Sequence, residues 1–366
     1  MPADADFAAW LRLIETPGLG RASARRLLAA LGSPDAVLGA TEARRAAIVG
    51  PAVAAALREP PPDWPQRLAA ALAWLAGEPN RSVLTLDHPD WPPLLLQSPD
   101  PPLLLYVEGD AKRLAAPALA IVGSRHATPQ GIDHARRFGS AIGNAGWVVV
   151  SGLAAGIDAA AHEGALASAA GTVAVCGTGL DQVYPARHRA LARRIAAHGA
   201  LISEYSPGME ALAHNFPRRN RIIAGLTRGT LVVEAALKSG SLITARLAAE
   251  AGREVFAMPG SIHAPQSRGC HDLIKQGAKL VETVQDIFDE LGAGGIGAAA
   301  VAPPAPAADT TDPLLQALGA ESLTLDELQD RSGWPADRLA ARLLDLELEG
   351  RLARLPGGRF QRRFAA

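Results

Sequence analysis

The stretch from Phe216 to Ser241, FPRRNRIIAGLTRGTLVVEAALKSGS, combines residue types that bind anions. Pro217 suits the first turn of a helix because its ring fixes φ and it has no N–H group to leave unpaired. Arg218, Arg219 and Arg221 would then fall in that first turn, where cations oppose the helix dipole by a few tenths to about 1 kcal/mol each. A bound anion would offset this cost, so the pattern indicates an anion site.

A second anion-binding element follows in the same stretch. The apolar run from Leu231 to Leu237 is typical of a strand that is buried on both faces. Ser241 is expected to cap the next helix, which ends at Gly252. Exposed N–H groups at that helix start would lie beside the ammonium group of Lys238. The candidate ligands of this element are Lys238, Ser239, Gly240 and Ser241.

From Leu119 onward, glycines at regular intervals mark the ends of the strands and helices that would position these groups. The apolar strands LAIVG, WVVVS, TVAVC, ALISEY, LVVEA and EVFAMPG alternate with helices, and AKLVET could add an edge strand. This alternation predicts an α/β fold with a Rossmann-like, doubly wound parallel sheet. Right-handed crossovers place the carboxyl end of every strand on one edge, where open α/β sheets bind ligands.

Two further turns would converge on this edge. Gly123, Ser124 and Arg125 follow the first strand, so that the Arg125 guanidinium and helix N–H groups could share one phosphate. Ser151 and Gly152 follow the second strand and offer hydroxyl and amide donors. Several phosphate sites in a row suit a polymer better than a mononucleotide. The open alternative is that the arginines pair internally with carboxylates at strand ends, namely Asp158, Asp181, Glu204 or Glu234.

Motifs for cofactors and catalysis are incomplete. The first turn lacks the GxGxxG pattern of dinucleotide sites, and CGTGL at Cys176 to Leu180 is only a fragment in the third unit. GxSxG and the Walker sequence are absent, and His162-Glu163 lacks the second histidine of HExxH. We therefore predict neither cofactor nor metal. Asp158 or Glu204 could still act as an acid-base group, which leaves a nucleotide-processing enzyme as the alternative function.

Composition limits how nucleic acid could be bound. The 366-residue chain has a formal net charge of −1 and a pI near 6.8, so binding would need a local basic patch. Aromatic residues make up 4 %, which favours grip on the backbone over base readout. The rings available for base stacking are Phe216, Tyr184, Tyr205 and His214.

The cell compartment is predicted from cysteines and segment types. Cys176 and Cys270 match no metal or redox spacing and suit a reducing cytoplasm. The first residues lack the regions of a signal peptide, and no apolar run reaches membrane-spanning length. We expect a soluble cytoplasmic protein that does not insert in membranes.

The chain divides into four predicted parts. Residues 1–78 form an all-α region in which the turn from Pro17 to Gly20 joins two helices, as in helix-hairpin-helix or SAM-like domains. Such turns either contact a DNA backbone or simply connect helices. Residues 79–291 form the extended Rossmann-like domain, and residues 292–312, rich in Gly, Ala and Pro, form a flexible linker.

Residues 313–366 are predicted to be a winged helix. Thr324 and Glu327 make a capping box, Pro335 opens a second helix, and a hairpin turns at Gly357-Gly358. The second helix is net acidic and would repel phosphate, although the hairpin is basic. A protein-contact or auxiliary role is therefore at least as favoured as groove reading.

Six motifs in order, IVGSR, SGLAAGIDAAAH, GTGLDQVYP, FPRRNRIIAGL, SGSLITA and GREVFAMPG, closely resemble the DNA-processing protein A (DprA, also called Smf) family. The resemblance implies a non-enzymatic protein of natural transformation and DNA recombination. Such a protein binds and protects incoming single-stranded DNA, loads the RecA recombinase onto it, and forms homodimers through the extended Rossmann domain. The chain departs from the family at His188 and His271, where Asn is usual.

The resemblance also implies a DNA pocket lined by the GSR arginine, the basic residue before SGSL, and the RNR segment. Those positions here are Arg125, Lys238, Arg219, Asn220 and Arg221. The predicted function is thus a single-stranded DNA-binding recombination mediator, with the enzyme and a duplex-reading regulator as alternatives. The complete predicted site is Gly123, Ser124, Arg125, Ser151, Gly152, Arg219, Asn220, Arg221, Lys238, Ser239, Gly240 and Ser241.

Overall fold

The computed structural model describes residues 4–292, 312–319, 321–355 and 357–363. The predicted linker at 292–312 therefore lies almost entirely outside the described residues. No helix among the described residues is both long and apolar enough to cross a bilayer.

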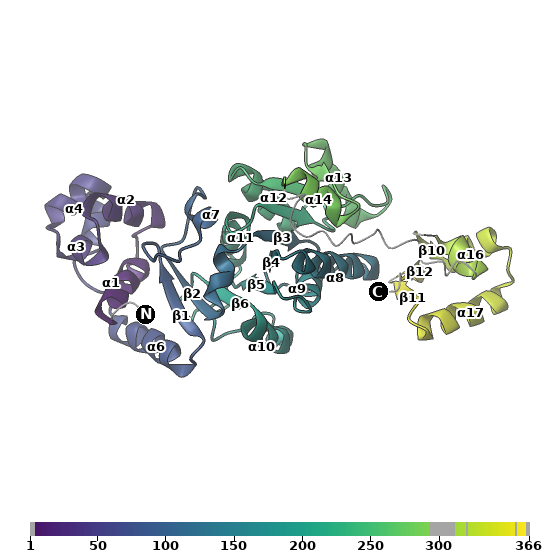
Figure 1. The fold of residues 1–366 in the computed structure, drawn as a ribbon, viewed down its shortest axis with the longest axis horizontal. Coiled ribbons are helices and arrows are strands. Elements are labelled where there is room, and N and C mark those ends of the chain that lie inside the picture. Colours follow the sequence, from purple (N-terminus) through teal and green to yellow (C-terminus); the bar gives the residue numbers. More distant parts are fainter. Residues whose placement is uncertain (1–3, 293–311, 320, 356, 364–366) are drawn as a thin grey trace.

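The chain begins with helices (Figure 1). Their bounds are α1 (Asp4–Glu15), α2 (Arg21–Leu31), α3 (Pro34–Gly39), α4 (Glu42–Val49), α5 (Pro51–Ala55) and α6 (Trp64–Gly77). The turn from Pro17 to Gly20 joins α1 to α2, as predicted. Buried Trp10, Leu27 and Trp74 pack in one cluster with Tyr106 of the neighbouring sheet. The first helices and the sheet thus share a core, and the domain bounds given above stay predictions.

The sheet within the described residues has nine strands in the order β1-β2-β6-β5-β4-β3-β7-β8-β9. Strands β3 to β9 pair in parallel, whereas β2 runs antiparallel to both β1 and β6. The predicted Rossmann-like sheet is confirmed, and the two strands before it extend its edge. The bounds are β1 (Arg81–Thr85), β2 (Leu104–Gly109), β3 (Ala118–Val122), β4 (Val148–Ser151), β5 (Thr172–Val175), β6 (Ala200–Ser203), β7 (Gly229–Val232), β8 (Glu254–Ala257) and β9 (Lys279–Leu280).

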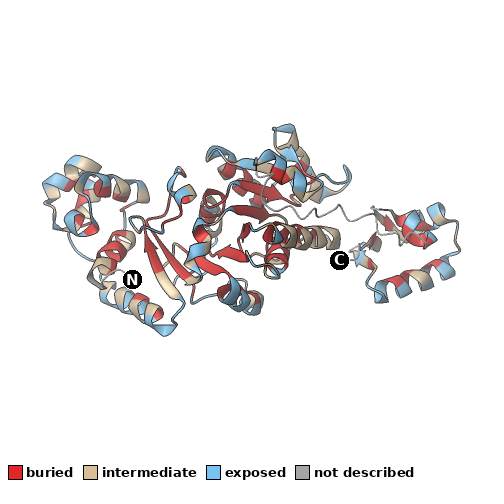
Figure 2. Cartoon of the chain, viewed as in Figure 1, coloured by how far each residue is buried: buried red, intermediate tan, exposed pale blue. Residues whose placement is uncertain are grey.

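Helices cover both faces of the sheet, and the parallel strands β3 to β7 between them are buried (Figure 2). The first face carries α8 (Pro129–Asn144), α9 (Ile157–Ala165), α10 (Arg189–His198) and α14 (Val284–Glu290). The second face carries α7 (Pro93–Leu96), α11 (Asn215–Gly225), α12 (Gly240–Glu250) and α13 (Arg268–Lys275). Burial on both faces explains why the strands are apolar without alternation.

A winged helix follows, at the yellow end of Figure 1. Its elements are α15 (Pro313–Leu318), β10 (Ser322–Thr324), α16 (Leu325–Ser332), α17 (Ala336–Leu348), β11 (Leu352–Leu355) and β12 (Arg359–Arg362). The Thr324–Glu327 capping box and the start of α17 after Pro335 are confirmed. The side chain of Gln361 donates a hydrogen bond to that of Gln130 at 2.9 Å, which places β12 against α8.

Candidate nucleic-acid interface

The carboxyl ends of β6, β5, β4, β3, β7 and β8 lie next to one another along one edge of the sheet. We call this the ligand edge. Neighbouring strands in a sheet lie about 4.8 Å apart, so these six ends span about 24 Å. An edge of this length can hold several phosphates of an extended strand.

The turn after β3 presents Arg125 to solvent. A Cβ atom on Gly123 would lie 2.7 Å from Ile157 Cγ1 and 2.9 Å from the Glu234 carbonyl oxygen, so glycine is needed here. The carbonyl oxygen of Ser124 accepts from the Ile157 amide at 3.2 Å. These contacts hold the turn, while Arg125 is exposed and forms no ion pair with a described residue.

The turn after β4 is already occupied by internal bonds, which corrects part of the predicted site. The Ser151 hydroxyl is buried and donates to the Ile121 carbonyl oxygen at 2.6 Å. The Gly152 amide donates to Asp158 Oδ2 at 3.1 Å. Burial raises the pKa of the Asp158 carboxyl, although the Arg219 charge and backbone amides oppose the shift. Neither donor is open to a phosphate in this conformation.

Arg219 is buried behind the ligand edge, contrary to the expectation of an open cation. Its side chain donates to the carbonyl oxygens of Gly152, at 2.6 Å, and of Val175, and its Nε donates to Asn220 Oδ1 at 3.0 Å. Burial lowers the pKa of the guanidinium, and the charge of Asp158 acts in the opposite direction. Arg219 therefore joins the ends of β4 and β5.

The helix start explains this inward orientation. Helix α11 begins at Asn215, two residues before Pro217, so Arg219 and Arg221 lie beyond its first turn. Asn215, Arg219 and Ile222 fall on its buried face, as the 3.6-residue period requires. The dipole argument for an anion at this helix is correspondingly weaker.

Arg221 is paired internally, which is the alternative that the sequence left open. Its Nη2 lies 2.5 Å from Glu204 Oε2, and its Nε lies 3.1 Å from Asp100 Oδ2. The Arg221 side chain is 11 % exposed. Glu204 was an expected partner, whereas Asp100 was not.

The turn after β7 keeps two predicted groups accessible. Ser239, rather than Ser241, is the N-cap of α12, and its hydroxyl accepts from the Ser241 amide at 3.3 Å. Ser241 is buried. Gly240 and Lys238 are exposed, and Lys238 forms no ion pair with a described residue. Because β3 and β7 are neighbours, Lys238 and Arg125 stand on adjacent turns.

Two aromatic rings add an apolar surface at the end of β5. The centroids of Tyr184 and Phe216 are 5.1 Å apart, and Tyr184 is 53 % exposed. Arg219 lies over the Phe216 ring at 5.9 Å from its centroid. Tyr184 was among the rings considered for stacking, but the pairing could not be seen in the sequence.

The comparisons with known proteins agree with this architecture. Residues 82–292 match the family described as DNA recombination-mediator protein A, and residues 298–358 match the DprA winged helix domain. The chain belongs to the DprA family. The resemblance seen in the motifs is thus confirmed over most of the chain.

The matches to curated DprA relatives extend over most of the length of those relatives. Protein Smf of Escherichia coli is 43 % identical over 301 residues, 79 % of each chain. DNA processing protein DprA of Streptococcus pneumoniae is 49 % identical over 191 residues, which are 52 % of this chain and 67 % of that protein.

Two solved DprA structures are similar in fold. The X-ray structure of the Streptococcus pneumoniae protein has a TM-score of 0.68 and 36 % identity, over 79 % of this chain and 98 % of that one. A Helicobacter pylori DprA structure, described for its single-stranded DNA binding mode, has a TM-score of 0.53 and 31 % identity, over 58 % of this chain and 96 % of that one.

The two histidines at which the resemblance led us to expect Asn bond to turn backbone. His188 Nδ1 donates to the Leu153 carbonyl oxygen at 2.9 Å, and His271 Nε2 lies 3.0 Å from the Gly260 carbonyl oxygen. Each ring thus braces a turn that follows a strand of this DprA family member.

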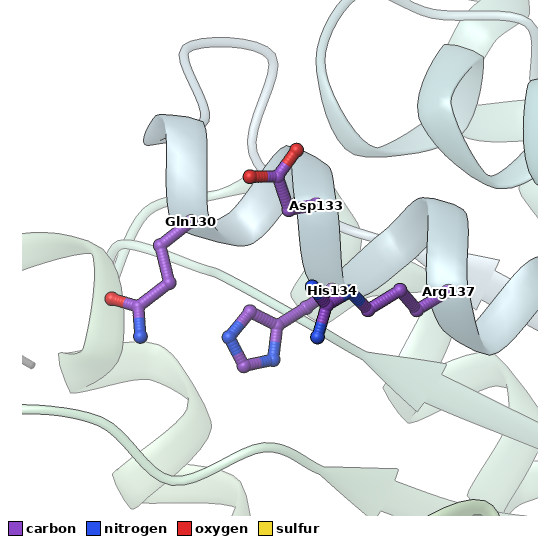
Figure 3. A pocket seen from close by; sticks show the side chains of 4 residues that line it. All are labelled: Gln130, Asp133, His134 and Arg137. Atoms are coloured by element: carbon purple, nitrogen blue, oxygen red, sulfur yellow. The ribbon is translucent and has the colours of Figure 1, made fainter. Parts of the chain in front are cut away.

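The described lining of a cavity of about 280 Å³ contains none of the predicted site residues of this DprA chain. Its described lining is Gln130, Asp133, His134 and Arg137, all from α8 (Figure 3). Arg363 also lies 3.5 Å from Asp133. The cavity therefore borders the contact between α8 and the winged helix.

Proposed function

We propose that this protein binds single-stranded DNA along the ligand edge and acts as a recombination mediator. The observation that carries the proposal is the pair Arg125 and Lys238, two exposed cations on adjacent turns, neither of which has an ion-pair partner among the described residues. Phosphates supply the missing charge. The single-stranded DNA binding described for the Helicobacter pylori relative supports this choice of ligand.

The predicted site residues take two different roles in this proposal. Arg125, Lys238 and the exposed Gly240 backbone contact the DNA backbone. The Tyr184 ring, which rests against Phe216, stacks on a base. The remaining residues position the turns: Gly123, Ser124, Ser151, Gly152, Arg219, Asn220, Arg221, Ser239 and Ser241.

We also propose that the protein is cytoplasmic and acts in natural transformation. There it would protect incoming strands and load RecA onto them. A recombinase must reach the bases while the mediator holds the strand, and a grip through phosphates leaves base edges free.

We further propose a homodimer. Three exposed apolar side chains, Leu237 (58 %), Ile243 (40 %) and Ile262 (73 %), flank the neighbouring turns after β7 and β8 and suit contact with a second copy.

The enzyme alternative gains no support from the carboxylates. Asp158 accepts hydrogen bonds from the Gly152 and Ala154 amides, and Glu204 is paired with Arg221. Both are thus occupied in structural contacts. We propose a non-enzymatic role.

A length titration tests the function. Fluorescence anisotropy would measure the affinity for DNA of one to about ten nucleotides, a range that extends into the footprint of known single-strand sites. A DNA binder gains affinity steeply with length and shows no turnover. Saturation by a mononucleotide, accompanied by turnover, would overturn the proposal.

A further inference from the structure

Three arginines and two carboxylates meet where the first helices contact the sheet. Arg21 Nη2 and Arg25 Nη1 lie 2.6 Å and 2.8 Å from the two oxygens of Asp100. Arg221 bridges Asp100 and Glu204 from α11. Arg21 also lies 3.6 Å from Glu204. We call these five residues the junction cluster.

The cluster carries one more positive charge than negative. Burial alone would raise the pKa of Asp100, but hydrogen bonds from Arg21 and Arg25 and the charge of Arg221 lower it below the ordinary value. Asp100 is therefore ionised at neutral pH. Three guanidinium groups thus lie within ion-pair distance of only two carboxyl groups, those of Asp100 and Glu204.

The cluster also holds two buried polar atoms without a hydrogen-bond partner, the donor Arg221 Nη1 and the acceptor Glu204 Oε1. Helix α2 starts after Gly20, which offers no side-chain cap, and its first residue is Arg21. A cation at that position opposes the helix dipole, and an anion would offset this cost.

The cluster lies at one end of the ligand edge. Glu204 directly follows β6, whose carboxyl end belongs to this edge. Tyr205 is the next residue after Glu204. The charges of Arg221, Arg21 and the exposed Arg218 are close enough to act on its hydroxyl, where they oppose the rise in pKa that burial causes. The cations thus continue from the edge onto the first helices.

We propose that the junction cluster is a phosphate-binding site that extends the DNA path from the ligand edge onto the N-terminal helices. The inference rests on the proposed function. In this arrangement a backbone phosphate of the strand sits beside the partly exposed Arg21 and Arg25 and neutralises the surplus charge, while Arg221 holds the two carboxylates from behind.

The competing explanation is that the cluster only fastens the helices to the sheet. Charge variants separate the two because they act in opposite directions. Asp100→Asn and the double variant Arg21→Gln, Arg25→Gln both break the ion pairs of Asp100 with Arg21 and Arg25. The first raises the net positive charge, whereas the second lowers it. If the cluster only holds the helices against the sheet, the affinity for DNA should change in the same direction in both variants.

The experiment measures affinity for an oligonucleotide of about twenty residues as a function of salt. We expect Asp100→Asn to steepen the slope of log affinity against log salt concentration by about 0.7. The ratio of variant to wild-type affinity should therefore be about fivefold higher at 0.1 M salt than at 1 M salt. We expect Arg21→Gln, Arg25→Gln to change the slope by a similar amount or more in the opposite direction. Arg44→Gln, an exposed change on α4, should leave binding unchanged.

Three outcomes decide between the explanations. Weaker or unchanged binding by Asp100→Asn would overturn the inference. So would unchanged binding by Arg21→Gln, Arg25→Gln. If Asp100→Asn fails to fold, the charge-conserving Arg21→Lys, Arg25→Lys must keep near wild-type affinity, and an affinity as low as that of the glutamine variant would overturn the inference.

Failure of the proposed function looks different. In that case the wild-type chain shows no length-dependent binding, whatever the junction variants do. If wild type binds and Arg125→Ala weakens binding while the junction variants do not change it, only the inference fails.

Discussion

Arg219 Nη1 lies 2.6 Å from the carbonyl oxygen of Gly152 and donates a hydrogen bond to it. The same nitrogen also donates to the Val175 carbonyl oxygen, so one guanidinium closes the ends of two adjacent strands. The cation is buried beneath the edge that Arg125 occupies in solvent. Under the proposed function, one arginine thus serves structure and another serves contact with DNA.

Arg219→Ala should destabilise the fold. Two buried carbonyl oxygens lose their donor, which costs about 2 to 4 kcal/mol in the free energy of unfolding. Loss of the nearby charge also leaves the buried Asp158 carboxyl less compensated. Denaturant unfolding measures the change. Arg125→Ala, an exposed change, is the matched control and should unfold at the wild-type midpoint.

Arg125→Ala and Lys238→Ala should each weaken binding to single strands of any sequence. Each removes one phosphate contact, so the salt slope should fall by about 0.7 and affinity by about fivefold at 0.1 M relative to 1 M salt. Anisotropy titrations at several salt concentrations measure both quantities.

The control for these two variants is Lys275→Ala, which removes an exposed lysine at the far end of α13. It should bind as wild type does. Unaltered affinity in both Arg125→Ala and Lys238→Ala would show that the ligand edge is not the DNA site.

Local pattern was enough to predict the elements and the exposed position of Arg125 at the ligand edge. Glycine-ended apolar strands located the sheet, and the turn chemistry after Gly123 placed Arg125 correctly at the edge. The capping box at Thr324 likewise required only neighbouring residues. Each of these features is set within a few positions of the chain.

Long-range pairing could not be predicted in the same way. The bond between Arg221 and Asp100 joins residues 121 positions apart, and no local pattern encodes that distance. The burial of Arg219 did leave a signal, because Ile222 and Ile223 follow at helical spacing. Placing the helix start at Pro217 rather than Asn215 concealed it.

Tyr184→Ala should weaken binding without changing its salt dependence. Stacking of a base on an aromatic ring contributes about 1 to 3 kcal/mol and releases no counterions. Tyr184 is the exposed member of the pair with Phe216. Tyr184→Phe keeps the ring and should bind as wild type does. A reduced salt slope in Tyr184→Ala would instead indicate a disturbed phosphate contact.

His162 should make the fold sensitive to acid. Burial, with the charges of Arg219 and His188, lowers the pKa of His162 to about 3, and its Nδ1 lies 2.7 Å from Thr172 Oγ1. Below about pH 6.5 an unfolded chain binds a proton there that the native chain does not. The contribution of His162 to the free energy of unfolding is therefore fully present above that pH, and it is lost as the pH drops toward 3.

His162→Gln removes this group and isolates its effect from other titrations. Thermal or denaturant unfolding at pH 7.5 and pH 5 would measure the free energy of unfolding of both proteins. The wild type should lose more stability than the variant between the two values. Equal losses would show that His162 is not responsible.

Truncation after Gly292 should affect single-strand binding less than Arg125→Ala does. The outer part of α17 presents Asp345 and Glu347 with the exposed Leu344 and Leu348, a surface that repels phosphate and suits a protein partner. In the hairpin, Arg359 is held by Ser322 and Glu327 rather than open. We therefore expect an unchanged salt slope in the truncated chain. A slope lowered by 2 or more, at about 0.7 for each phosphate contact, would assign the winged helix a direct share of the DNA backbone.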